Sequence, residues 1–257
     1  MPTFLITGCS SGIGLELAKT LAARGDTVYA TVRRRESSMT GVDAISAVAA
    51  SSDNVHILEG VDVAVDGVGQ VLATALAGVA LDVVIHNAGS LNATREHGTD
   101  VQAAFGEQKL ASISMDRMRA VFELNTLGPL RVMKAVLPNV VSPGGKVISI
   151  STGLGSIGDN GSGGHYAYRT SKAALNMVTK NFACDLKESG IAVAAVAPGT
   201  IATNFGPGIE AMTKFGAKPP AQACEGILRT IDELTMEKTG QYIMVPTSGG
   251  APTEFPW

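Results

Sequence analysis

The feature that most constrains the fold is a glycine-rich turn near the start of the chain. It spans Thr7 to Gly14 and lies between the apolar run 4–6 and a segment of helical periodicity. Gly8 permits a tight turn, Gly12 lets the backbone approach a pyrophosphate, and Gly14 lets the helix pack closely on the strand. The N-terminus of the following helix favours negative charge. The segment therefore predicts a phosphate-binding turn within a βαβ unit.

Short apolar runs rich in β-branched residues alternate along the chain with longer segments of helical periodicity. This alternation is typical of βαβ units and a parallel sheet, and runs that are apolar throughout indicate strands covered on both faces. We therefore predict an α/β fold with a doubly wound, Rossmann-type parallel sheet of about seven strands. The expected strands are 4–7, 28–32, 55–60, 81–86, 146–151, 191–196 and 242–245, and helices are expected to begin near Gly12, Gly67, Met115, Tyr166 and Pro220.

Residues 1–257 are predicted to form one domain. This length lies at the upper end of what one hydrophobic core supports, and no repeat or low-complexity linker marks a boundary in the sequence. Two segments interrupt the alternation, at about residues 90–114 and 203–220. Long connections in α/β proteins often bind ligands, so both segments are predicted to shape a substrate pocket.

Composition and charge narrow the class of partner. The chain is 45% hydrophobic with a formal net charge of -3, whereas proteins that bind nucleic acid usually carry a basic excess or stripe. No apolar run in the sequence approaches the roughly 20 residues of a membrane span. The three cysteines form no metal-type pair, the four histidines are scattered, and no charged leader precedes the first strand. We therefore expect a cytoplasmic protein without a nucleic-acid partner, a membrane partner or a metal.

The residues after the second predicted strand indicate which dinucleotide the turn would bind. In Rossmann-type sites an acidic residue there binds the ribose 2′-hydroxyl of NAD and repels the extra phosphate of NADP. Here the strand is followed by Arg33, Arg34 and Arg35. Arg33 could form charge-assisted hydrogen bonds with a 2′-phosphate, and Ser11 could add a hydroxyl. NADP(H) is therefore favoured; Arg35 is interpreted as a solvated turn residue, and the role of Arg34 stays open.

A tyrosine and a lysine stand four residues apart on the helix expected after the fifth strand. Tyr168 and Lys172 fall on the same face of that helix. A nearby ammonium favours the phenolate, which eases proton exchange with a carbonyl or alcohol oxygen near neutral pH. Tyr166 is the weaker choice because Thr170, four residues further on, carries no charge. We therefore predict Tyr168 as the proton donor and Lys172 as its electrostatic partner.

The glycine turn resembles the Thr-Gly-x-x-x-Gly-x-Gly signature of the short-chain dehydrogenase/reductase family, and the resemblance extends along nearly the whole chain. Residues 86–89 are similar to the family's Asn-Asn-Ala-Gly, with His86 in place of the first Asn. By this resemblance, Lys172 would also hold the nicotinamide ribose. The sequence around Tyr168, together with residues 155–158 and 256–257, resembles the subgroup of C-factor and sniffer-type carbonyl reductases.

The resemblance assigns further roles. A hydroxyl residue at the end of the fifth strand would hold the substrate oxygen; Thr152 takes that place, and its neighbour Ser151 is the alternative. Asn125 would bind a water in the proton relay to Lys172. The turn and the resemblance together imply cofactor contacts from Gly8, Ser10, Ser11, Gly12, Ile13, Gly14, Arg33, Asp62, Val63, Asn87, Ala88, Gly89, Tyr168, Lys172, Pro198, Gly199, Thr200, Ile201 and Thr203.

The implied function is reversible hydride transfer between NADP(H) and a small carbonyl or alcohol substrate, such as a ketone or aldehyde. Many relatives associate through helices, so a homo-oligomer, a dimer or tetramer, is also conceivable. Two alternatives stay open. One is an NADP(H)-binding signalling or sensor protein of the C-factor type, which would have no need of the Tyr168 proton donor; the other is an isomerase or epimerase. Fold and cofactor site do not specify the substrate.

Overall fold

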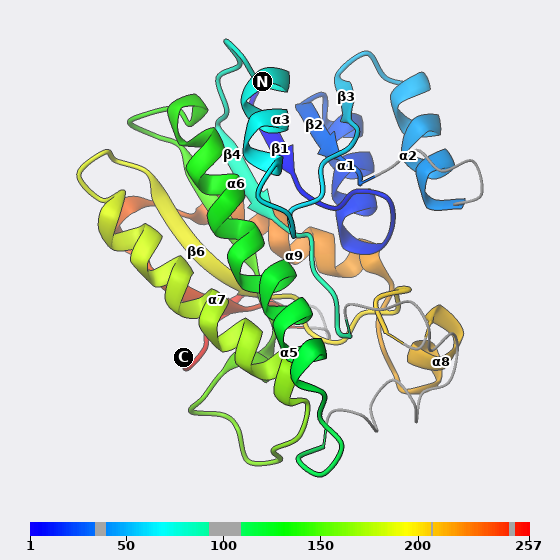
Figure 1. Ribbon diagram of the computed structural model, residues 1–257. Coiled ribbons are helices and arrows are strands. Elements are labelled where there is room, and N and C mark those ends of the chain that lie inside the picture. Colours follow the sequence, from blue (N-terminus) through cyan, green and yellow to red (C-terminus); the bar gives the residue numbers. More distant parts are fainter. Residues whose placement is uncertain (34–39, 93–108, 207, 247–249) are drawn as a thin grey trace.

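The strands form one sheet in the structure, a computed structural model that describes residues 1–33, 40–92, 109–206, 208–246 and 250–257 (Figure 1). Most strands are short apolar runs rich in β-branched or alanine residues, which suits a sheet covered by helices; the exposed two-residue strand β8 is the exception. The strands are β1 (Thr3–Ile6), β2 (Thr27–Thr31), β3 (Val55–Leu58), β4 (Val83–His86), β5 (Lys146–Ile150), β6 (Ala192–Ala197), β7 (Gln241–Met244) and β8 (Thr253–Glu254).

The sheet has the strand order β3-β2-β1-β4-β5-β6-β7-β8. Strands β1 to β7 are parallel, and β8 pairs antiparallel with β7. Phe4 of β1 is opposite Val28 on one side and Val83 on the other, so the chain reverses its direction of winding at β1. Ligands of such sheets bind at the carboxyl ends of the strands beside this reversal. The predicted α/β Rossmann-type fold is confirmed.

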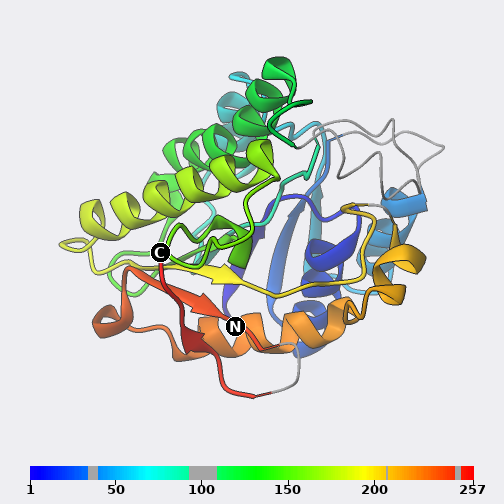
Figure 2. The same ribbon diagram turned by 90° about the horizontal axis from the view of Figure 1, so that it is seen from below.

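Helices cover both faces of the sheet, as Figure 2 shows for α6 and α7 on one face and α1 and α9 on the other. One apolar core joins Leu17, Ile45 and Ile227 to the sheet, and the other joins Leu72 and Val132 to the opposite face. The helices are α1 (Gly12–Arg24), α2 (Thr40–Ala50), α3 (Val68–Ala75), α5 (Met115–Phe122), the π-helix η1 (Glu123–Leu127), α6 (Gly128–Val136), η2 (Leu137–Asn139), η3 (Gly153–Gly155), α7 (Tyr166–Asp185), α8 (Ile209–Lys214), α9 (Pro220–Glu233) and η4 (Met236–Lys238).

The sequence predictions did not include α2, α8, β8 or the three-residue helices η2, η3 and η4. Helix α2 consists mostly of small and apolar residues, so its sequence carries no clear polar face to mark a helix. Helix α8 lies inside the predicted loop 203–220 and is only six residues long. Strand β8 has two residues, too few for a recognisable alternation. The segment 203–220 is therefore a connection with a short helix of its own, whereas residues 93–108 of the other predicted loop lie outside the described part of the chain.

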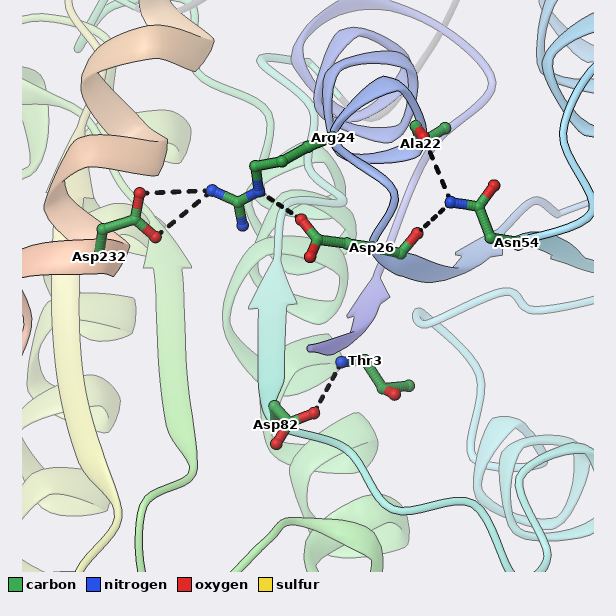
Figure 3. Close-up of polar contacts among 7 residues, drawn as sticks. All are labelled: Thr3, Ala22, Arg24, Asp26, Asn54, Asp82 and Asp232. Atoms are coloured by element: carbon green, nitrogen blue, oxygen red, sulfur yellow. Dashed lines mark hydrogen bonds and ion pairs between the residues drawn. The ribbon is translucent and has the colours of Figure 1, made fainter. Parts of the chain in front are cut away.

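A polar cluster, drawn in Figure 3, lies at the amino ends of β2 and β3, whereas the glycine turn follows the carboxyl end of β1. Arg24 at the end of α1 pairs with the buried carboxylate of Asp26 and with Asp232 of α9, the latter at 3.3 Å. Asn54 donates hydrogen bonds to the carbonyls of Ala22, at 3.2 Å, and Asp26, at 2.6 Å.

The described helices include none that is both long and apolar enough to cross a membrane.

Candidate active site

The glycine turn has no room for side chains. Gly8 and Gly12 have φ angles of +74° and +60°, the left-handed region that favours glycine. A Cβ atom on Gly14 would lie 2.4 Å from the carbonyl oxygen of Gly8 and 2.5 Å from Nδ2 of Asn87. Each of the three glycines named in the sequence motif therefore has a physical reason to be glycine. The neighbouring Ile13 packs against the core below the turn.

Hydrogen bonds join the turn to the loop that follows β4 and to the last residue of β2. Thr7 Oγ1 accepts from the backbone N–H groups of Asn87 and Ala88, both at 3.0 Å. Asn87 Nδ2 donates to the carbonyls of Thr7, at 2.9 Å, and Gly8, at 3.1 Å. The Gly8 N–H in turn donates to Thr31 Oγ1 at 3.2 Å. The structure thus brings together two of the predicted cofactor segments at one edge of the sheet.

The amino end of α1 is open to an anion. Within the described part of the chain, the Ser11 hydroxyl caps no backbone N–H of α1, and the first turn of that helix holds no acidic residue. Ser10 is half-buried, whereas Ser11 and Arg33 are exposed. A Cβ atom on Gly12 would lie 3.3 Å from Cγ2 of Thr203, so the segment after β6 closes over the turn. A narrow glycine cradle, a free helix end and a nearby arginine fit a dinucleotide phosphate. Arg34 and Arg35 lie outside the described residues.

The remaining predicted cofactor residues also follow the carboxyl ends of strands. After β3, Asp62 Oδ1 accepts a hydrogen bond from the Ala64 N–H at 3.0 Å, and the buried Val63 packs against Gly128 of α6. After β6 the chain turns through four predicted residues, of which Gly199 has a φ of +80°. The other three are the buried Pro198, the exposed Thr200 and the buried Ile201.

Tyr168 and Thr152 meet, and Ser151 points elsewhere. The Tyr168 phenol, only 7% exposed, forms a hydrogen bond with the Thr152 side chain. Ser151 Oγ instead donates to Oδ1 of Asn176 on α7 at 2.6 Å. Successive side chains at the end of a strand point to opposite sides, which explains why only one of the two hydroxyls reaches Tyr168. The geometry therefore favours Thr152 as the hydroxyl beside the phenol.

Lys172 is buried next to Tyr168. Its Nζ donates a hydrogen bond of 2.8 Å to the carbonyl of Ile150 and lies 6.0 Å from the centroid of the Tyr168 ring. Burial lowers the pKa of Lys172 to about 8. Burial also raises the pKa of Tyr168 above its ordinary value, and the hydrogen bond with Thr152 opposes this only in part. Burial has the largest effect on the pKa of Tyr168 and favours the protonated phenol, and the lowering of that pKa by Lys172 stays a prediction.

Asn125 lies in the π-helix η1 and is fully buried. Its Nδ2 donates to the Ser90 carbonyl at 2.9 Å and to Ser171 Oγ at 3.0 Å, and its Oδ1 accepts from the Ser90 N–H at 2.9 Å. Protein groups take both hydrogens of Nδ2 but only one lone pair of Oδ1, so the water-binding role stays a prediction. These bonds tie the loop after β4 to α7, which carries Tyr168 and Lys172.

Two residues near the site were not predicted individually. Phe205 lies in the predicted loop 203–220, and its ring is 5.6 Å from that of Tyr168, edge to face. A Cβ atom on Gly89 would lie 3.5 Å from Lys172 Nζ and 3.8 Å from Phe205, so these residues border one space. Tyr242 of β7 donates a hydrogen bond to the Thr152 carbonyl. For Phe205 the only sequence signal was that its segment interrupts the alternation of helices and strands. Tyr242 had no such signal, because its sequence context is that of an ordinary strand.

His86 ends β4 and is 2% exposed. Neither of its ring nitrogens has a hydrogen-bond partner among the described residues. Burial lowers the pKa of His86 from 6.5 to about 4. Above pH 6.5 this histidine is neutral in both the folded and the unfolded chain, and the contribution of buried His86 to the free energy of unfolding is complete. As the pH falls toward 4, the unfolded chain binds the proton first, and this contribution is lost.

His86→Leu is therefore expected to remove part of the acid sensitivity of the fold. Between pH 7 and pH 5 the wild type should lose about 2 kcal/mol of unfolding free energy through this one group. The variant should lose less by about that amount in urea unfolding at the two pH values. The exposed His56 offers the control, His56→Leu. An equal loss in all three proteins would show that His86 does not cause the acid sensitivity.

Comparison with known proteins agrees with this geometry. The family model described as short chain dehydrogenase matches residues 2–214. The 1-hydroxy-2-glutathionyl-2-methyl-3-butene dehydrogenase of Rhodococcus sp. (strain AD45) is 34% identical over 244 residues, which cover 94% of this chain and 96% of the relative. The C-signal protein of Myxococcus xanthus is 34% identical over 178 residues, 69% of this chain and 93% of the relative.

Two solved structures extend the likeness to three dimensions. The carbonyl reductase Sniffer of D. melanogaster has a TM-score of 0.79 and 27% identity, with 100% of both chains covered. A putative short-chain dehydrogenase/reductase from Burkholderia multivorans, solved with bound NADP, has a TM-score of 0.76 and 28% identity, with 95% of this chain and 96% of that chain covered.

Proposed function

The chain belongs to the short-chain dehydrogenase family of oxidoreductases, as predicted, and we propose that it transfers a hydride between NADP(H) and the carbonyl carbon of a ketone or aldehyde. One observation carries this proposal: the buried Tyr168 phenol is hydrogen-bonded with Thr152 and lies beside Lys172. A protonated phenol next to a second hydroxyl suits the donation of a proton to a carbonyl oxygen.

The cofactor would lie along the carboxyl edge of the sheet. Its phosphates would meet the amino end of α1, and Arg33 would bind the 2′-phosphate. Lys172 would hold the nicotinamide ribose. When bound, NADPH would supply the hydride equivalent, and NADP would accept it in the reverse direction. The NADP in the similar Burkholderia structure supports this choice of nucleotide.

The residues of this chain would handle the oxygen and the proton. Thr152 Oγ1 would donate a hydrogen bond to the substrate carbonyl oxygen, and Tyr168 Oη would deliver a proton to it. The Lys172 ammonium would stabilise the charge left on Tyr168 Oη. In alcohol oxidation the same oxygen would return its proton to Tyr168. Asn125 would act by holding the loop after β4 against α7 rather than by touching the substrate.

Thr152→Val is expected to lower kcat about 100-fold or more, because one hydrogen-bond donor to the developing oxyanion is removed while the shape is kept. Thr152→Ser should retain most of the activity, since serine has the same donor and acceptor. Ser151→Ala is the matched control and should lose far less than Thr152→Val in steady-state assays. A larger loss in Ser151→Ala than in Thr152→Val would assign the substrate oxygen to Ser151.

The proposal is tested by measuring NADPH and NADH oxidation against a panel of aldehydes, ketones, quinones and steroids. We expect turnover with at least one compound and a preference for NADPH. Arg33→Ala should weaken NADPH binding by about 10-fold or more, the effect of losing a hydrogen bond between charged groups, and should leave NADH binding nearly unchanged.

Arg119→Ala is the control for that variant because Arg119 is exposed and, among the described residues, pairs with Asp116 of the same helix at 2.7 Å. It should leave the binding of both nucleotides unchanged. Equal losses of NADPH and NADH binding in Arg33→Ala would contradict the 2′-phosphate contact. If no compound of the panel is reduced, the proposed activity is wrong.

The likeness to the C-signal protein supports one alternative, an NADP(H)-binding signalling or sensor protein with little catalysis. NADPH binding without turnover of any panel compound would favour it. Product analysis would likewise expose an isomerase or epimerase, which would consume no net NADPH. A dimer or tetramer stays a prediction.

A further inference from the structure

Tyr242 lies fully buried on β7, directly behind the candidate oxygen anchor. Its hydroxyl donates a hydrogen bond to the Thr152 carbonyl. That carbonyl also accepts from the Gly155 N–H at 2.8 Å, so both of its lone pairs are engaged. The parallel pairing of β5 with β6 ends at Ile150. The Ser151 N–H still donates to the Val196 carbonyl at 2.7 Å, so Thr152 stands just beyond the regular ladder with its carbonyl held by the two bonds.

A buried network extends from Tyr242 to the residues on either side of Thr152. Burial raises the pKa of Tyr242, and hydrogen bonds with the side chains of Ser151 and Asn176 oppose the rise. Asn176 accepts from Ser151 at 2.6 Å and donates to the Gly155 carbonyl at 3.2 Å. The chain before and after Thr152 is thus fixed to one cluster of polar groups between β7 and α7.

Aromatic residues from the C-terminal segment hold the Tyr242 ring. Trp257 stacks on it with 5.2 Å between ring centroids and an interplanar angle of 28°, and Phe255 meets it edge to face at 5.4 Å. The main-chain oxygen of Trp257 accepts from the N–H groups of Ile157, at 3.1 Å, and Gly158, at 2.9 Å. The segment after β8, red in Figure 2, therefore fastens the loop that begins at Thr152.

We propose that Tyr242 is a positioning residue: its hydroxyl fixes the Thr152 backbone so that the Thr152 side chain meets Tyr168, and Phe255 and Trp257 hold the Tyr242 ring in place. This inference rests on the proposed function, because it concerns the group that would hold the substrate oxygen. A displacement of about 1 Å at such a group can cost about 100-fold in rate. Tyr242 touches neither substrate nor cofactor in this scheme.

The decisive variant is Tyr242→Phe, which removes one oxygen and keeps the aromatic packing. We expect kcat for carbonyl reduction to fall by about 10-fold to 100-fold with nearly unchanged NADPH binding. Tyr29→Phe is the matched control, since Tyr29 lies on β2 and packs against the His56 ring at a tilt, away from Thr152. Equal kcat values for the two variants would overturn the inference.

A double-mutant cycle separates positioning from a general loss of stability. If Tyr242 acts through Thr152, the variant Thr152→Val with Tyr242→Phe should be no slower than Thr152→Val alone. If the two losses multiply, Tyr242 acts by another route and the inference is wrong. Trp257→Leu, which keeps the main-chain oxygen but removes the stacked ring, should lower kcat in the same direction but less.

Hydrogen exchange tests the inference independently of turnover. The Leu154 N–H donates to Thr152 Oγ1 at 3.3 Å, and the Gly155 N–H donates to the Thr152 carbonyl. Both amides should exchange about 10-fold faster in Tyr242→Phe and at the wild-type rate in Tyr29→Phe. Unchanged exchange would overturn the positioning role even in an active enzyme. A wild type without carbonyl reduction but with this change in exchange would overturn only the proposed function.

Discussion

Tyr168→Phe is expected to lower kcat for carbonyl reduction about 1000-fold, because the variant keeps the ring and loses the only proton donor proposed for the substrate oxygen. The phenol is buried and protonated at neutral pH, so its loss removes an acid that is ready to react. NADPH binding should be nearly unchanged, since Lys172 and the glycine turn remain. Steady-state kinetics and a fluorescence titration with NADPH would measure the two effects.

Tyr166→Phe is the matched control for that variant. Tyr166 lies two residues away on the same helix, is half-buried, and has Thr170 rather than a lysine one turn further on. We expect its loss of hydroxyl to leave kcat nearly unchanged. Retained turnover in Tyr168→Phe, or an equal loss in Tyr166→Phe, would remove Tyr168 from the proposed role.

Gly14→Ala is expected to lower the unfolding free energy by about 3 kcal/mol and to abolish NADPH binding, because the new methyl group meets backbone that cannot yield. The Cβ would lie 2.4 Å from the Gly8 carbonyl oxygen and 2.5 Å from Asn87 Nδ2. Either the turn or the loop after β4 must shift, and both are predicted to bind the cofactor. Urea unfolding and nucleotide titration would measure the two losses.

A second helical glycine provides the comparison. Gly69 lies in α3, where an added Cβ would meet only the Cβ of Ala135 at 3.8 Å, an ordinary contact. Gly69→Ala should therefore be neutral or stabilise the fold by up to about 1 kcal/mol, since alanine is the better helix former. Similar urea midpoints for the two variants would show that the turn tolerates a side chain.

Most of the fold could be predicted from the sequence because the strands of a parallel sheet are marked by local apolar runs. The strands are short apolar runs, and the glycine turn fixes the first βαβ unit, so pattern alone predicted β1 through β7. What local pattern could not give were elements that depend on tertiary contacts. Strand β8 exists through its pairing with β7, and helix α2 shows no amphipathic stripe.

The candidate site was predictable where a motif carried it and not where packing decides. Tyr168, Lys172 and the glycine turn follow from spacing and resemblance. The choice between Thr152 and Ser151 needed the direction of each side chain at the strand end, which spacing does not fix. The raised pKa of Tyr168 needed its burial. Tyr242 is 90 residues from Thr152 along the chain, and no local pattern links the two.

The polar cluster around Arg24, Asp26 and Asn54 has a consequence for how such a protein can diversify. These contacts, drawn in Figure 3, secure the chain just before β2 and β3, whereas the loops around the proposed pocket leave from the carboxyl ends of the strands. Insertions and exchanges in the segment 203–220 therefore leave this fastening intact. In evolution or in design, residues at the carboxyl edge of the sheet can therefore change to accept new substrates while the contacts at the amino edge keep the fold stable.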